Sequence, residues 1–372
     1  MTQSPAAVES GTIKERMMTV YNGRMPDRVP VSVYTRYLKR GAFERTVRNH
    51  GLGIIDYAPP VSMLAPAWHI LPGFLSEVEG AEFRVRYRWE NGRRIERREF
   101  ETPVGSVFQD TESDPAGAGS EHIRSHYVNS RDDYRTINYI FAHTRFVPNA
   151  ALLKGRMADL GSDGVVLGRV DRSPYQKLLL EVVGPEKFLI DLSMDPDPVE
   201  EVLYTAQARA TEAMERILDT EAELIWLPEN VTVDMTPPQA FEKYHLDYYA
   251  RWAQASAAKN KPLVVHIDGR LRPLADLIKR ARIPVIESVS APSIGGDLEL
   301  GQAQDLFADA VILPNVPSNW ALLDNQEIAR ELRRMIADAR ADRPWMLQFS
   351  EDIPVHELAR VMSVVVQEQA LG

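Results

Sequence analysis

Residues able to do acid–base or metal chemistry stand at the ends of three successive apolar runs. Glu229 follows ELIWL, His266 and Asp268 end PLVVHI and its continuation, and Glu287 ends PVIE. If these runs are neighbouring parallel strands, which lie about 5 Å apart, one imidazole and two or three carboxylates meet around one point. Such a donor set binds a divalent cation, and the same convergence suits a carboxylate pair acting as general acid and base. The residues alone leave both interpretations open.

Other strand ends add candidates around this point. Asn315 follows VILP and Glu351 follows WMLQFS, and either side chain can orient a substrate or the metal ligands. An apolar mouth that holds a flat substrate is predicted from the aromatic residues Tyr34, Tyr57, Trp68 and Trp320, and Arg36 is a further candidate for binding the substrate. Ordinary packing of the core and the barrel rim is the alternative explanation for the aromatic members of this set.

A parallel barrel is the arrangement that brings these strand ends together. From about residue 160 onward, short apolar runs alternate with amphipathic stretches, as in a parallel sheet covered by helices. Strands are predicted at 28–34, 53–57, 163–170, 223–227, 262–267, 283–288, 310–313 and 344–349. Eight strands favour an α/β fold of the (β/α)8 TIM-barrel type, whose active sites lie at the C-terminal ends of the strands.

The first part of the chain departs from this alternation. We expect one barrel domain over 1–372, with 1–20 as an N-terminal extension and about 80–120 as an inserted hairpin and loop. Asn91-Gly92 between two β-like runs is typical of a tight hairpin turn. The small, acidic stretch 110–120 is predicted to be a loop that serves as a docking or lid element.

Composition excludes several classes of function. The 372 residues carry a net charge of -10, which argues against a nucleic-acid partner. The chain has no cysteine, so any metal must be held by nitrogen and oxygen, and a cysteine nucleophile is excluded. The P-loop, the dinucleotide fingerprint and the serine-hydrolase elbow are missing as well. Without a signal peptide or a run of about 20 apolar residues, we expect a cytoplasmic protein that binds no membrane.

Several motifs along the chain resemble the uroporphyrinogen-decarboxylase superfamily. They are Pro26–Val31, Arg40-Gly41, Arg48–Leu52, Thr102–Gly105, Pro228–Asn230, His266–Gly269, Gly296–Leu298, Asn315–Ser318 and Glu351–Pro354. The pattern is similar to the branch of cobalamin-dependent methyltransferases, and the resemblance extends from about residue 13 to the end. It implies a (β/α)8 barrel that holds zinc and moves a methyl group between a small molecule and a separate corrinoid protein.

One departure from that branch bears on the substrate. Relatives that methylate coenzyme M carry a cysteine where Asp268 stands, and this chain has none. An oxygen-rich zinc site fits demethylation of methyl ethers better, especially of O-methylated aromatics. The resemblance then implies zinc bound by His266 and two or three of Glu229, Asp268 and Glu287. The acceptor is a corrinoid, with a pterin left open, and pairing of such barrels allows a homodimer.

Two other functions remain as alternatives. A metal-independent decarboxylase of a polycarboxylate predicts an arginine-lined cleft, which Arg36 and Arg40 resemble loosely. A barrel without catalysis, serving as a binding subunit, predicts that Glu229 and Glu287 pair with arginines instead of facing each other.

Overall fold

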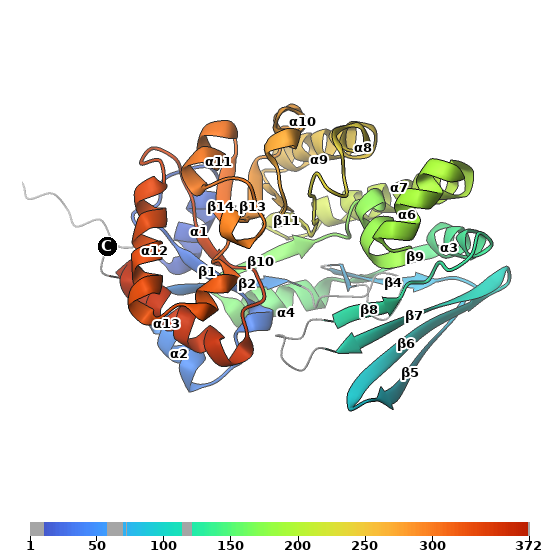
Figure 1. Cartoon of the computed structure of the whole chain (residues 1–372), viewed down its shortest axis with the longest axis horizontal. Coiled ribbons are helices and arrows are strands. Elements are labelled where there is room, and N and C mark those ends of the chain that lie inside the picture. The colour runs from blue at the N-terminus through green and yellow to red at the C-terminus, as the bar shows by residue number, and fades with distance from the viewer. Residues whose placement is uncertain (1–10, 58–69, 72, 114–120, 371–372) are drawn as a thin grey trace, which may run out of the picture.

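Eight parallel strands form a barrel in the computed structural model, which describes residues 11–57, 70–71, 73–113 and 121–370 (Figure 1). In spatial order they are β14 (Val311–Pro314), β13 (Val285–Val289), β12 (Leu263–His266), β11 (Leu224–Leu227), β10 (Gly164–Arg169), β2 (Leu52–Tyr57), β1 (Val31–Tyr34) and β15 (Leu347–Phe349). Parallel bridges from Ile312 to Trp345 and from Asn315 to Gln348 bring β14 beside β15, so the sheet nearly closes. The predicted (β/α)8 fold is confirmed, and each predicted run overlaps one barrel strand.

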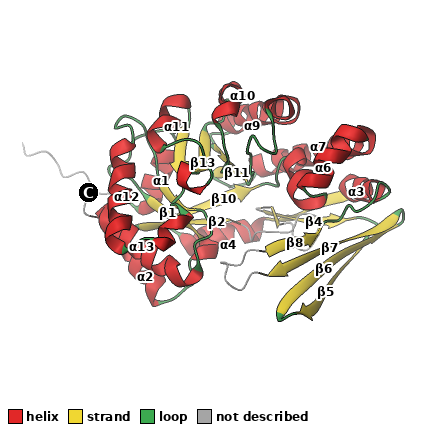
Figure 2. Cartoon of the chain, viewed as in Figure 1, coloured by secondary structure: helices red, strands yellow, loops and turns green. Residues whose placement is uncertain are grey.

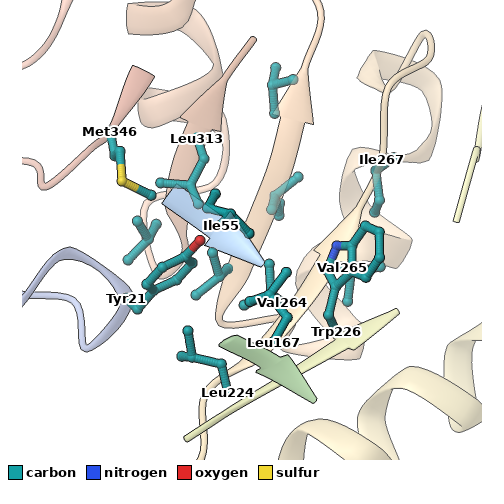
Figure 3. Packing of buried hydrophobic residues seen from close by; sticks show 14 of the residues in the cluster. Tyr21, Ile55, Leu167, Leu224, Trp226, Val264, Val265, Ile267, Leu313 and Met346 are labelled. Carbon is teal, nitrogen blue, oxygen red and sulfur yellow. The ribbon is translucent and has the colours of Figure 1, made fainter. Parts of the chain in front are cut away.

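Helices cover the outside of this barrel (Figure 2). They are α2 (Ala42–Asn49), α4 (Ala150–Leu160), α7 (Pro196–Leu218), α9 (Asp247–Ala258), α10 (Ala275–Ala281), α11 (Leu300–Leu306), α12 (Asn325–Asp338) and α13 (Val355–Ala370). The N-terminal helix α1 (Ile13–Tyr21) lies instead at the N-terminal end of the barrel, where Met17 and Val20 are fully buried and Tyr21 lies beside the interior residue Ile55 in Figure 3. Gly53 of β2 faces inward two residues before Ile55, and its lack of a Cβ gives room to the Met17 side chain of α1.

The barrel interior explains how the sheet aims the candidate residues. Side chains two positions apart on a strand point to the same face. Ile55, Leu167 and Val264 fill the interior in Figure 3. Two residues further along the same strands come Tyr57, Arg169 and His266, which therefore point inward at the C-terminal end. A packed apolar layer thus supports a layer of functional side chains above it.

A second region follows β2 and is larger than the predicted hairpin. One sheet contains β3 (Ile70–Leu71), β4 (Gly73–Val78) and β9 (Thr144–Asn149), and another contains β5 (Glu82–Glu90), β6 (Arg93–Thr102), β7 (Gly105–Ser113) and β8 (Glu121–Ser125). The predicted turn joins β5 to β6, with positive φ at both Asn91 and Gly92. The predicted loop is wrong over 110–113, which pair with β6 and β8, and residues 114–120 lie outside the described part.

This region has its own hydrophobic cluster. Phe100 of β6 packs with residues of α3 (Asp133–Ala142), α6 (Pro185–Met194) and the first half of α7. The short helix α5 (Pro174–Lys177), continued by a π-helical turn at Leu178–Val182, leads from β10 into this cluster. The region therefore lies beside the C-terminal ends of the strands, where β10 and β11 point in Figure 1. Within the described residues, no helix is long and apolar enough to cross a membrane.

Candidate metal centre at the barrel mouth

Three side chains converge at the C-terminal ends of β12 and β15. One ligand atom each of His266, Asp268 and Glu351 lies within 4.8 Å of the other two, so the three can hold a metal ion. His266 ends β12, Asp268 follows two residues later, and Glu351 comes two residues after β15. The Asn230 amide donates a hydrogen bond of 2.5 Å to Asp268 Oδ2, which fixes that carboxylate. The centre combines one ring nitrogen with two carboxylates, a donor set suited to zinc and similar cations.

Glu287 lies behind His266 and orients its ring. The fully buried Glu287 carboxylate accepts hydrogen bonds from the Tyr34 hydroxyl (2.7 Å), the Trp226 indole (2.5 Å) and the Gln348 amide (3.0 Å). Its Oε2 lies 3.4 Å from His266 Nδ1, while His266 Nε2 faces Asp268 at 3.8 Å. A histidine that binds metal through one nitrogen commonly has the other held by a carboxylate. Glu287 therefore holds the Nδ1 side of the His266 ring and leaves His266 Nε2 available as the ligand atom.

Glu351 is held by neighbours on the opposite side. The Asn315 amide donates to Glu351 Oε1 at 3.0 Å, and the Ser288 hydroxyl donates to the same oxygen at 3.4 Å. Ser288 has φ of 64°, which is uncommon for a residue other than glycine. The strand register shifts between Glu287 and Val289, so Ser288 occupies an irregularity of β13. This kink turns the Ser288 hydroxyl toward Ser350 and Glu351.

The electrostatics of the centre favour a positive charge. Burial acts to lower the pKa of His266, but hydrogen bonds and charges from Asp268 and Glu287 outweigh it and raise that pKa to about 9. Burial acts to raise the pKa of Asp268, and the His266 ring and Arg172 lower it on balance. Burial, followed by the charge of Asp268, raises the pKa of Glu351. A divalent cation would satisfy both carboxylates in place of the imidazole proton.

Two of the predicted ligands lie outside this group. Glu229 is fully buried and accepts hydrogen bonds from the Ser173 backbone (2.8 Å) and hydroxyl (3.1 Å), beside His245. Its backbone follows β11, but its carboxylate turns toward the loop after β10 instead of toward β12. Glu287 is engaged by the three donors behind His266. Glu351, predicted to orient ligands, lies inside the group, and Asn315 contacts it.

Aromatic rings line the barrel next to the centre. Tyr34 lies 5.3 Å from Tyr57 and 5.7 Å from Trp226, and Trp226 lies 6.2 Å from His266, all between ring centroids. Trp226 was missing from the sequence prediction, although its place two residues after Leu224 on ELIWL points it into the barrel. Tyr34 and Tyr57 are two of the predicted mouth residues, and they lie beside the centre as expected.

The remaining mouth residues are dispersed. Arg36 lies at the rim, where its guanidinium bonds to Tyr37 and reaches Asp352 at 3.3 Å. Trp320 is buried and lines a separate cavity beside α11 and α12, away from the aromatic rings. Trp68 lies outside the described residues.

A comparison with models of protein families assigns the chain to one family. The family model for uroporphyrinogen decarboxylase (URO-D) matches residues 173–368, more than half of the chain. The protein therefore belongs to the uroporphyrinogen decarboxylase family, which confirms the resemblance drawn from the motifs. No curated protein matches the sequence at a significant level.

Solved structures support the fold. A methyltransferase from Methanosarcina mazei is similar over 96% of this chain and 98% of its own, with a TM-score of 0.55 and 15% sequence identity. At that identity the likeness shows a shared fold. A structure of the tandem catalytic modules of the pneumococcal exo-β-D-N-acetylglucosaminidase StrH aligns over 92% of this chain and 84% of its own, with 10% identity. Its TM-score of 0.36 is too low to indicate a shared fold.

Proposed function

We propose that this protein is a zinc-dependent methyltransferase that transfers a methyl group from a small methyl ether to a corrinoid carried by a partner protein. The observation that carries the proposal is the convergence of His266, Asp268 and Glu351 at the mouth of the barrel. The family, and the fold shared with a methyltransferase, are consistent with it.

The residues present fit a zinc ion. His266 Nε2 and one oxygen each of Asp268 and Glu351 supply three protein ligands, the number usual in a catalytic site that keeps one position open. Two carboxylates make this donor set harder than a thiolate set, which suits an oxygen substrate over a thiol. When bound, zinc supplies Lewis acidity toward the ether oxygen, and thereby favours departure of the alkoxide or phenolate.

The surrounding side chains have separate tasks. Glu287 and Tyr34 hold His266, Asn230 holds Asp268, and Asn315 holds Glu351, so the ligand atoms are oriented before a substrate arrives. The Tyr34, Tyr57 and Trp226 rings form an apolar floor beside the ligands, which excludes water and packs against a flat substrate. In the transfer, the bond from the ether oxygen to the methyl carbon breaks, its electron pair stays on oxygen, and the methyl group passes to the corrinoid.

The rival functions make different demands on the same residues. A non-catalytic barrel predicts arginine partners for Glu229 and Glu287, whereas Ser173 holds the first and Tyr34, Trp226 and Gln348 hold the second. A decarboxylase predicts arginines at the mouth, and Arg36, Arg169 and Arg172 do lie there. The decarboxylase is therefore the second candidate, and carbon dioxide release without a corrinoid would identify it.

The deciding experiment measures metal content and methyl transfer together. Purified protein should contain close to one zinc per chain, and should methylate free cob(I)alamin when supplied with methoxylated aromatics. Removal of the metal with a chelator should abolish transfer, and zinc should restore it. Protein that stays metal-free after incubation with zinc, or transfers methyl groups equally well without metal, would contradict the proposal.

A further inference from the structure

A buried lysine lines a cavity that the proposed methyl transfer does not use. Lys177 is the last residue of α5, and only 3% of it is exposed. The cavity has a volume of about 50 Å³ and lies between α5, the sheet of β4 and β9, and α7. Val78, Phe141 and Phe146 form an apolar wall, and the cavity shares no lining residue with the metal centre. A chemically reactive group therefore lies beside a small apolar space in a second part of the molecule.

The amine of Lys177 has fewer partners than it can serve. Its Nζ donates a hydrogen bond to Asp171 Oδ2 and lies 5.9 Å from the centre of the Phe141 ring. Within the described part of the chain, Asp171 is the one acceptor of this amine. An ammonium group offers three N–H donors, so two of them are left for water or for a ligand in the cavity.

Burial makes the neutral form of this amine accessible near neutral pH. It lowers the pKa of Lys177 to about 7, while the charge of Glu181 acts to raise that pKa and the charge of Arg169 acts to lower it further. Arg172 and Arg209 also line the cavity, and each is bound to a glutamate. A lysine that is desolvated in this way acts as a nucleophile, whereas exposed lysines, with a pKa of about 10.4, stay protonated.

We propose that Lys177 forms an imine with a short aliphatic aldehyde bound in this cavity. The Lys177 nitrogen adds to the carbonyl carbon, two of the three ammonium protons pass by way of Asp171 to the carbonyl oxygen, and that oxygen leaves as water. A carbon–nitrogen double bond remains. The protonated imine carries the same single positive charge as the ammonium, so the ion pair with Asp171 is kept. Carbon dioxide would instead give a carbamate, an anion that Asp171 repels.

The cavity also limits the size of the aldehyde. At about 10–15 Å³ for each water molecule, its 50 Å³ holds only a few waters, so an aldehyde of about three carbon atoms fits. The apolar wall packs against an alkyl chain and offers nothing to a second charged group.

The first test labels the unmodified protein with propanal and cyanoborohydride, which reduces an imine to a stable secondary amine. At neutral pH, Lys177 should gain an N-propyl group at least about 10-fold faster than the exposed Lys259 and Lys279, whose ammonium groups titrate about three pH units higher. Peptide mass spectrometry of timed samples measures the three rates. With rising pH the Lys177 rate should level off above about pH 8, while the other two continue to rise. A Lys177 that stays unmodified, or reacts no faster than the exposed lysines, would overturn the proposal.

Two variants then assign the reaction to this amine and this cavity. Ala210→Leu fills part of the cavity from α7, and should slow the labelling of Lys177 several-fold while leaving that of Lys259 unchanged. Lys177→Arg keeps a positive charge beside Asp171 but has no primary amine, so the fast phase of propyl incorporation should disappear. If Lys177→Arg does not fold, the wild type and Ala210→Leu decide the question.

An unchanged Lys177 rate in Ala210→Leu, or a fast phase that persists in Lys177→Arg, contradicts the assignment. The labelling needs no metal and no corrinoid. Its failure therefore leaves the proposed methyl transfer intact, and absence of methyl transfer leaves the aldehyde site standing.

Discussion

Two histidine–glutamate pairs lie in the same barrel and have opposite electrostatics. At the mouth, His266 faces Asp268 and Glu287 and its pKa is raised to about 9. Behind the loop after β10, His245 and Glu229 meet at Ser173, and burial lowers the pKa of His245 to about 3 and raises the pKa of Glu229 to about 7. The environment of His266 therefore favours its charged form, whereas that of His245 and Glu229 favours the neutral form of both.

The pKa values of the two histidines differ because only His266 has acidic neighbours that offset the effect of burial. At His266, acidic neighbours contribute more than burial removes, so a cation is stabilised there. At His245, burial is the only cause of the shift, and its Nε2 has no hydrogen-bond partner among the described residues. His245 lies on a π-helical turn (Glu242–Leu246), stacked 5.3 Å from Tyr249. The same two residue types thus make a cation site in one place and a packed polar core in the other.

The largest expected effect comes from removing each histidine in turn. His266→Ala should lose the bound zinc, and its methyl-transfer kcat/KM should fall by more than about 100-fold, because even residues that only support a ligand cost 10- to 100-fold. His245→Ala should keep the metal and lose about 2–4 kcal/mol of unfolding free energy through the cavity it creates. Metal analysis and urea denaturation measure the two outcomes.

Swapped outcomes would break the comparison. If His245→Ala lost the metal while remaining folded, the Ser173–Glu229–His245 site would take part in metal binding, as the sequence predicted for Glu229. If His266→Ala retained stoichiometric zinc, His266 would be a core residue.

The second prediction uses the pH dependence of stability. The pKa of Glu229 is about 7 in the folded chain against 4.5 as a reference, so the folded state holds more protons between these values. Its contribution to the unfolding free energy must then fall as pH rises from 4.5 to 7, by about 3 kcal/mol at 1.4 kcal/mol per pKa unit. Glu229→Gln cannot titrate, and its stability relative to the wild type should therefore improve by that amount between pH 4.5 and 8.

His245 provides the opposite slope and a control. Its folded pKa is below the reference value of 6.5, so its contribution falls as pH decreases below 6.5. In the wild type the two slopes oppose each other between pH 4.5 and 6.5, which is why a single variant is needed to separate them. Urea denaturation profiles of wild type and Glu229→Gln that run parallel across this range would show that Glu229 stays ionised.

The sequence predicts the barrel well because strand and helix patterns are local. Hydrophobic periodicity and the alternation of side chains along each strand predict all eight strands and the convergence of His266 with Asp268. The Asn-Gly pair predicts the tight turn at Asn91-Gly92. The direction of side chains in the loops after the strands cannot be predicted from these patterns. Glu229 follows its strand just as Asp268 does, yet its carboxylate bonds to Ser173 from the preceding loop. The seven-stranded region beside the mouth was underestimated, because β4 pairs with β9 some 70 residues away, and only the fold brings them together.

A smaller effect should follow from changing the support of His266. Glu287→Gln preserves the shape but removes the negative charge behind the ring, so the ring loses its preferred orientation. We expect zinc affinity to fall by about 10- to 100-fold with little loss of fold. Gln348→Leu, which removes only one of the three donors to Glu287, should have a lesser effect. Competition with a chromogenic chelator measures both, and unchanged affinity in Glu287→Gln would remove Glu287 from the centre.

The smallest effect separates strain from contact at Ser288. Its positive φ costs about 1–2 kcal/mol for a residue with a Cβ, and Ser288→Gly should therefore be more stable than Ser288→Ala by about 1 kcal/mol. Both variants lose the hydroxyl that contacts Glu351, so both should bind zinc a few-fold more weakly. Arg282, also at positive φ but at the end of α10, is the control whose change to glycine or alanine should alter stability alone. If Ser288→Gly binds zinc as tightly as the wild type, the Ser288 hydroxyl is not needed to position Glu351. The irregular backbone of β13 would then be what separates the metal centre at His266 from the buried pair of His245 and Glu229.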